Sequence, residues 1–153
     1  MSCLQFGSFG KWAGLLFPVL ILVQGCEPRG PVELSSGAVE CAQCHMTIVD
    51  PRFAAQVHTD KGRVVFFDSI ECALRFVGQN RTRVRTVYLR SFGGPPRWIE
   101  ASEARIARWA GFRSPMGGNL AAFESELEAR QWFESNQVAP QAFEIRQWAD
   151  FVG

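Results

Sequence analysis

The sequence lacks an excess of charge of either sign, and it lacks an apolar run long enough to cross a membrane. Lys11 is the only charged residue before Glu27. The rest of the chain therefore contains 15 of the 16 basic residues and all 15 acidic residues. A balanced chain does not form the concentrated basic surface that phosphate backbones require, which argues against nucleic acid as a partner. The longest uncharged apolar run, residues 12–23, falls short of the roughly 20 residues of a membrane-spanning helix.

The N-terminal segment, residues 1–25, has the pattern of a lipoprotein signal peptide. Its apolar run has the length of the core of a secretory signal. Gly25 then stands directly before Cys26, which resembles a bacterial lipobox. We therefore expect cleavage before Cys26, acylation of that cysteine, and a location on a bacterial membrane facing the periplasm or the cell exterior. Residues 26–40, rich in Pro, Gly and Ser, are expected to form a flexible tether.

The remainder of the chain shows a weak internal repeat. The pattern of residues 67–80 recurs at residues 123–136, with one constant offset of 56 positions. A duplication of this kind predicts two small lobes, each with a few antiparallel strands packed against one helix, in an α+β fold. We place the first unit at residues 41–80 and the second at residues 81–137. The tail, residues 138–153, is expected to pack on the body as a short helix.

Local signals support a strand–strand–helix order in the first unit. Residues 54–58 and 63–67 are β-prone and are separated by a turn sequence that ends in Gly62. Asp68 is expected to cap the following helix, and Gly78 is expected to end it.

The second unit repeats the strand and helix of the first, with residues 119–123 as its strand. Between the two copies, residues 83–91 are expected to form a strand, and residues 97–99 the start of another, on either side of a turn at residues 93–96. Ser125 and Glu128 form a capping-box pattern before a helix that carries Leu127 on its apolar side.

Sulfur and imidazole donors are concentrated just before the first predicted strand. Cys41, Cys44, His45 and Met46 lie within six consecutive positions. Thiolate and thioether donors together favour Cu(I) over harder ions. Zinc has little use for a thioether, and the chain lacks a second cysteine pair at the spacing of structural zinc sites.

Met116 is a further candidate ligand, because its surroundings do not resemble a core. It lies in a turn-rich loop, residues 113–119, with no apolar periodicity. The loop precedes a strand and helix, as Met46 precedes the first hairpin. If the two lobes pack with these loops facing each other, both thioethers can approach the sulfur of Cys44.

Two other residues allow a functional and a structural interpretation. Cys72 falls in the first turn of a predicted helix, where the dipole favours the thiolate, or it is a small buried hydrophobe. His58, within an alternating strand, fits a surface or hydrogen-bonded histidine better than a ligand.

The cysteine pair also fits two other classes of protein. Cys41-x-x-Cys44-His45 is the attachment signature of c-type haem, and Met116 would then be a distal ligand. The predicted hairpin after the motif does not resemble the helices that enclose haem in small cytochromes. A thioredoxin-like redox pair is the second alternative, but that fold places the pair after a strand and at the start of a helix.

Several motifs together resemble the NosL family of copper-binding lipoproteins. The matching segments are Cys41-x-x-Cys44-x-Met46, Ala55-Gln56-Val57, Phe67-Asp68-Ser69-Ile70-Glu71-Cys72, Ser114-Pro115-Met116-Gly117 and Ala121-Ala122-Phe123. The resemblance implies a fold of two similar α/β lobes and Cu(I) supplied to nitrous oxide reductase with the help of a membrane transporter and its partner proteins. It carries ligand roles to Cys44, Met46 and Met116, and also to Cys41 and Cys72. The family most often has glycine where this chain has His45.

These observations give one mechanism to test. We expect Cu(I) between the lobes, held by Cys44, Met46 and Met116, with His45 or Cys41 as an adjustable extra donor. No side chains are spaced as a nucleophile and its base would be, so we expect a chaperone and not an enzyme.

Overall fold

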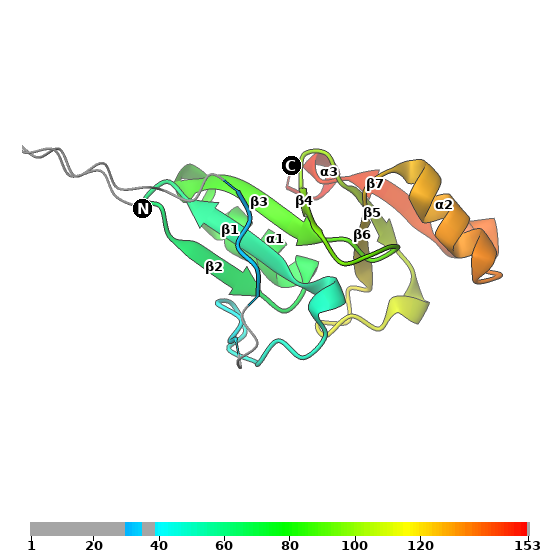
Figure 1. The fold of residues 1–153 in the computed structure, drawn as a ribbon, viewed down its shortest axis with the longest axis horizontal. Coiled ribbons are helices and arrows are strands. Elements are labelled where there is room, and N and C mark those ends of the chain that lie inside the picture. Colours follow the sequence, from blue (N-terminus) through cyan, green and yellow to red (C-terminus); the bar gives the residue numbers. More distant parts are fainter. Residues whose placement is uncertain (1–29, 35–38, 153) are drawn as a thin grey trace, which may run out of the picture.

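The computed structural model describes residues 30–34 and 39–152 and contains two antiparallel sheets (Figure 1). The predicted signal peptide and Cys26 lie outside the described residues. Two lobes, each a sheet with a helix, confirm the predicted α+β class. Within the described part of the chain, no helix has the length and apolarity needed to span a bilayer.

The first lobe is a four-stranded sheet with the order β2-β1-β3-β4. Its strands are β1 (Ala55–Thr59), β2 (Val64–Phe67), β3 (Val84–Arg90) and β4 (Trp98–Glu100). Helix α1 (Ile70–Gln79) packs on one face through side chains that include Ile70, Ala73 and Val77. The β1–β2 turn uses Gly62 at φ 73°, in the left-handed region that favours glycine.

The second lobe is a three-stranded sheet with the order β6-β5-β7. Its elements are β5 (Arg105–Arg108), β6 (Leu120–Phe123), β7 (Glu144–Gln147) and helix α2 (Glu126–Ser135). The short helix α3 (Ala149–Val152) follows β7. The described residues also contain four 3-10 turns: η1 (Pro51–Phe53), η2 (Arg81–Arg83), η3 (Ala110–Phe112) and η4 (Pro140–Ala142).

The two lobes repeat one plan at the predicted spacing. Strand β2 and helix α1 begin and end 56 positions before β6 and α2. Ser69 and Ser125 cap the two helices with nearly the same backbone angles, φ −152° and ψ 158° against φ −149° and ψ 162°. In each sheet the first strand of the repeat is central, because β1 lies between β2 and β3 and β5 lies between β6 and β7.

The limits of the lobes differ from the predicted units. Strands β3 and β4 pair with the first sheet, so residues 84–100 belong to the first lobe and not to a second unit that begins at residue 81. The tail contributes β7 to the second sheet and is more than a short helix. Both corrections have one cause: a central strand has two open edges, and each needs a partner that local sequence signals do not identify.

Three local predictions also need correction. Ser69, not Asp68, caps α1, because its hydroxyl accepts the N–H of Cys72 at 3.2 Å. The helix continues through Gly78 to Gln79. Leu127 is 66% exposed and does not join the core. The Ser125 cap is as predicted.

The predicted tether makes contacts with the first sheet. The amide group of Gln56 accepts from the backbone N–H of Val32 at 2.9 Å and donates to its carbonyl at 3.0 Å. Glu33 forms an ion pair with Arg90 at 2.9 Å. Figure 1 shows residues 30–34, in blue, running across the sheet on the side away from α1. This part of the predicted tether is therefore fixed to the folded body.

Candidate metal site

A tight loop ahead of β1 carries the first group of predicted ligands. The N–H of Cys41 donates to the carbonyl of Met46 at 2.8 Å, and the N–H of His45 donates to the carbonyl of Cys41 at 2.9 Å. The N–H of Ala42 donates to the carbonyl of Phe66 at 2.9 Å, which joins the loop to the end of β2. The loop is thereby closed on itself and held beside the start of α1.

His45 lies at a sharp turn of this loop. It has φ 62°, in the left-handed region that glycine adopts most freely and in which His, like Asn and Asp, is enriched among the other residues. Its side chain is 75% exposed, and its Nδ1 lies 2.9 Å from Oε1 of Glu40. His45 therefore points away from the cysteines as the loop stands.

Three cysteines and one carboxylate meet behind the loop. The ligand atoms of Cys41, Cys44, Asp68 and Cys72 all lie within 4.8 Å of one another, and the three cysteines are free thiols. Cys41 and Cys72 are 0% and 1% exposed, whereas Cys44 is half-buried. The fold thus brings together three of the predicted ligands, which are 31 positions apart in the chain at the extremes.

Asp68 is the residue that the sequence interpretation missed. Its Oδ2 accepts from the thiol of Cys44 at 3.4 Å, and its Oδ1 is buried without a partner among the described residues. Asp68 and Ser69 are both good capping residues, but one helix start uses only one of them. The adjacency of two such residues is the signal that one of them serves another purpose.

Burial keeps the thiols of Cys44 and Cys72 protonated in the metal-free protein. Desolvation is the largest cause that raises the pKa of Cys44, and its contacts with Cys41 and Asp68 add to the shift. A hydrogen bond from the backbone of Met46 acts in the opposite direction. Desolvation also raises the pKa of Cys72 strongly, against the lowering expected from its place at the start of a helix. A metal that binds here must displace protons.

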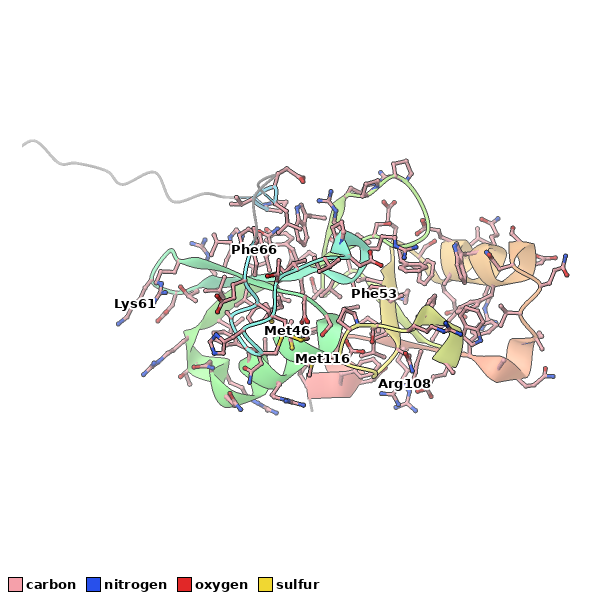
Figure 2. All side chains as sticks on the ribbon, turned by 90° about the horizontal axis from the view of Figure 1, so that it is seen from below. Met46, Phe53, Lys61, Phe66, Arg108 and Met116 are labelled. Carbon is pink, nitrogen blue, oxygen red and sulfur yellow. The ribbon has the colours of Figure 1, made fainter. Side chains whose placement is uncertain are left out.

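The two predicted thioethers border the same region. Met46 is 45% exposed, and Met116 is partly buried against the core cluster that contains Cys41 and Cys72. Their loops lie along the lower edge of Figure 1, and Figure 2, seen from below, shows Met46 and Met116 close together on that side. The soft donors of both lobes therefore gather at one edge of the molecule.

His58 does not belong to this group. It is 2% exposed, and its Nε2 lies 3.0 Å from Oε1 of Gln56, on the sheet face that residues 30–34 cross. Burial lowers its pKa, and the charge of Arg85 lowers it further. His58 is a buried, hydrogen-bonded histidine.

Comparisons with known proteins agree with the fold and the motifs. The model of the NosL family matches residues 31–143. The crystal structure of the copper chaperone NosL from Shewanella denitrificans is similar, with a TM-score of 0.67 and 19% sequence identity over 80% of this chain and 96% of that chain. At this identity the likeness shows a shared fold. A search of curated proteins finds no significant match. Because the family match spans most of its length, the chain belongs to the NosL family.

Proposed function

We propose that the protein binds Cu(I) at this edge and passes it to a recipient protein. The observation that carries the proposal is the convergence of three free thiols beside two methionines from different lobes. Soft donors of this kind select Cu(I). Membership of the NosL family, and the copper chaperone that shares the fold, support the same cargo.

The half-buried Cys44 is the proposed central ligand, with Met46 and Met116 as thioether donors. It lies between the buried cysteines and the exposed side of the loop, so it can reach both. Cys41 and Cys72 stand close enough to serve as additional thiolate donors. To become an additional nitrogen ligand, His45 would have to leave Glu40 and turn toward the cysteines.

The exposure of these donors suits transfer. Met46 is accessible, whereas Cys41 and Cys72 are enclosed. A recipient can therefore attach its own ligand on the Met46 side while the inner donors still hold the ion. We propose that the recipient is nitrous oxide reductase, reached with the help of membrane transporter proteins, because the family resemblance implies this route. The same resemblance, with the lipobox pattern at Cys26, supports a lipid-anchored extracytoplasmic protein without catalytic activity.

The structure weighs against covalent haem at the same motif. Attachment requires both cysteine sulfurs to reach the haem edge, but Cys41 is 0% exposed. His45, which would be the axial ligand, is held by Glu40 away from Cys41 and Cys44.

The test is competition for Cu(I) between the reduced full chain in detergent and a chromophoric chelator. We expect about one Cu(I) per chain and near-complete loss of binding in Cys44→Ser, because an alcohol is a poor ligand for a soft ion. Val49→Ser, in the same loop and 87% exposed, is the control and should bind as the parent does. Tight binding by Cys44→Ser would exclude Cys44 as the central ligand. A Soret band that survives acid–acetone extraction would overturn the proposal in favour of haem.

A further inference from the structure

A carboxylate on α1 reaches across to the loop that carries Met116. Oε1 of Glu71 accepts from the hydroxyl of Ser114 at 2.6 Å and from the backbone N–H of Leu120 at 3.3 Å. These two partners stand on either side of Met116 in the chain. Glu71 itself immediately precedes Cys72, so one residue joins the cysteine side of the site to the methionine side.

The loop is shaped to meet this carboxylate. The hydroxyl of Ser114 also accepts from the N–H of Asn119 at 2.8 Å, which closes the loop. Gly117 and Asn119 have φ of 73° and 58°, so the chain turns sharply after Met116. A Cβ at Gly118 would collide with the side chain of Glu71. The absence of a side chain at Gly118 is therefore what lets the two segments approach.

The contact is not a general feature of the repeated unit. Leu127 occupies the position equivalent to Glu71 in the second lobe, 56 residues later, and it is exposed. Oε2 of Glu71 is buried without a partner among the described residues. A buried oxygen without a partner costs free energy, so stability alone does not account for a carboxylate at this position.

We propose that Glu71 is a positioning residue that holds the Met116 loop against the start of α1 and so keeps the Met116 thioether beside the cysteines. This inference rests on the proposed function, since it assigns a purpose to the contact only if Met116 binds Cu(I). The competing explanation is structural: a negative charge in the first turn of a helix stabilises that helix through its dipole. The positioning role requires a side chain long enough to contact Ser114 and Leu120. The helix-dipole explanation requires only its negative charge.

Two substitutions separate reach from charge. Glu71→Asp keeps the charge in the first turn but is one methylene shorter, so it should lose the contacts with Ser114 and Leu120. Glu71→Gln loses the charge but keeps an oxygen that can accept both hydrogen bonds. We expect Glu71→Asp to weaken Cu(I) binding by about tenfold and Glu71→Gln to stay within about twofold of the parent. The matched control is Glu126→Asp, which shortens an exposed acid in the first turn of α2 and should leave Cu(I) affinity unchanged.

A double-mutant cycle with Met116→Leu tests whether Glu71 acts through Met116. If it does, Glu71→Asp should add less than about twofold to the loss already caused by Met116→Leu. The proposal would be overturned if Glu71→Asp lowered Cu(I) affinity by the same factor in the parent and in Met116→Leu. It would also be overturned if Glu71→Gln lowered Cu(I) affinity more than Glu71→Asp does.

Amide hydrogen exchange on the metal-free full chain gives a readout that does not depend on copper. Glu71→Asp should speed exchange at Asn119 and Leu120, and Glu71→Gln should not. If the parent chain binds no Cu(I), the proposed function fails, while this exchange pattern still decides whether Glu71 positions the loop. Unchanged exchange in Glu71→Asp would count against the positioning role.

Discussion

The two lobes share one strand–helix plan but place different chemistry at the junction. In the first lobe, Asp68 and Cys72 face inward beside Cys44. The equivalent residues of the second lobe are Glu124 and Glu128, of which Glu124 is exposed and pairs with Arg97 at 2.5 Å. The carboxylate of Glu128 accepts from the N–H of Glu124 at 2.7 Å and completes a helix cap. The same backbone therefore carries a cluster of candidate metal ligands only where a further loop covers the junction.

The second lobe instead carries an aromatic core. Phe133 stacks on Phe143 with ring centroids 3.7 Å apart. Other rings pack edge-on or tilted around this pair, among them Phe92, Trp109, Phe112, Phe123 and Trp132. Large rings bury much apolar area and fix their neighbours. We interpret the second lobe as the rigid support that presents the Met116 loop to the first.

Exchanging residues between the two junctions should give the largest effect. Cys72→Glu places the second-lobe residue at a position that is 1% exposed and is surrounded by the thiols of Cys41 and Cys44 and the carboxylate of Asp68. We expect a loss of unfolding free energy on the order of 4 kcal/mol, because an unpaired charge or a strained neutral acid is buried. Chemical denaturation measures this loss. Glu128→Cys, the reverse exchange, should lose about 1 kcal/mol at most, because only the cap contact is removed. Equal losses of unfolding free energy in the two variants would show that the two positions do not differ in their tolerance of a carboxylate.

Truncating the aromatic core should separate stability from copper binding. Phe133 is 1% exposed, so Phe133→Ala leaves a cavity and should lower the unfolding free energy by about 3 kcal/mol. Cu(I) affinity measured well below the unfolding midpoint should change by less than about threefold, because Phe133 is remote from the thiols. A tenfold loss of affinity would mean that the second lobe does more than support the site.

The pH dependence of Cu(I) binding should count the thiols that take part. The pKa of Cys44 and the pKa of Cys72 are raised, chiefly by burial, so both groups are protonated at neutral pH. Each thiol that binds Cu(I) releases one proton, and affinity should therefore rise by about tenfold per pH unit and per thiol ligand between pH 6 and 8. A chelator competition series over that range measures the slope. A slope of about one fits Cys44 alone, a slope of about two adds a second cysteine, and an affinity independent of pH would exclude thiol ligands.

Much of this comparison could be predicted from the sequence because the signals are local. The β2–α1 and β6–α2 segments are marked by turn and cap residues, and their repeat has one constant spacing. Strands β5 and β7 were missed, because both are short and carry arginines that give no clear alternation. Strand β5 is defined by its pairing with β6 on one side and β7 on the other, and pairing between residues about 40 positions apart leaves no local trace.

The candidate site could be predicted in part for the same reason. Cys41, Cys44 and Met46 stand out because they are adjacent, and Met116 stands out because its loop is polar. Asp68 and Glu71 do not, since both carry patterns that fit a helix start equally well. Their roles depend on which neighbours the folded chain places opposite them.

The smallest expected effect concerns the serines of the two helix caps, which make equivalent hydrogen bonds but differ in burial. Ser69 is 0% exposed and Ser125 is exposed. Ser125→Ala should cost about 0.5 kcal/mol of unfolding free energy, because water can replace the hydroxyl as acceptor for the N–H of Glu128. Ser69→Ala should cost about 2 kcal/mol, because the N–H of Cys72 is left in a site that water does not reach. Thermal and chemical denaturation of the two variants measure the difference. Equal costs would mean that Asp68 turns away from Cys44 to cap the helix, and Cu(I) affinity should then fall in Ser69→Ala alone.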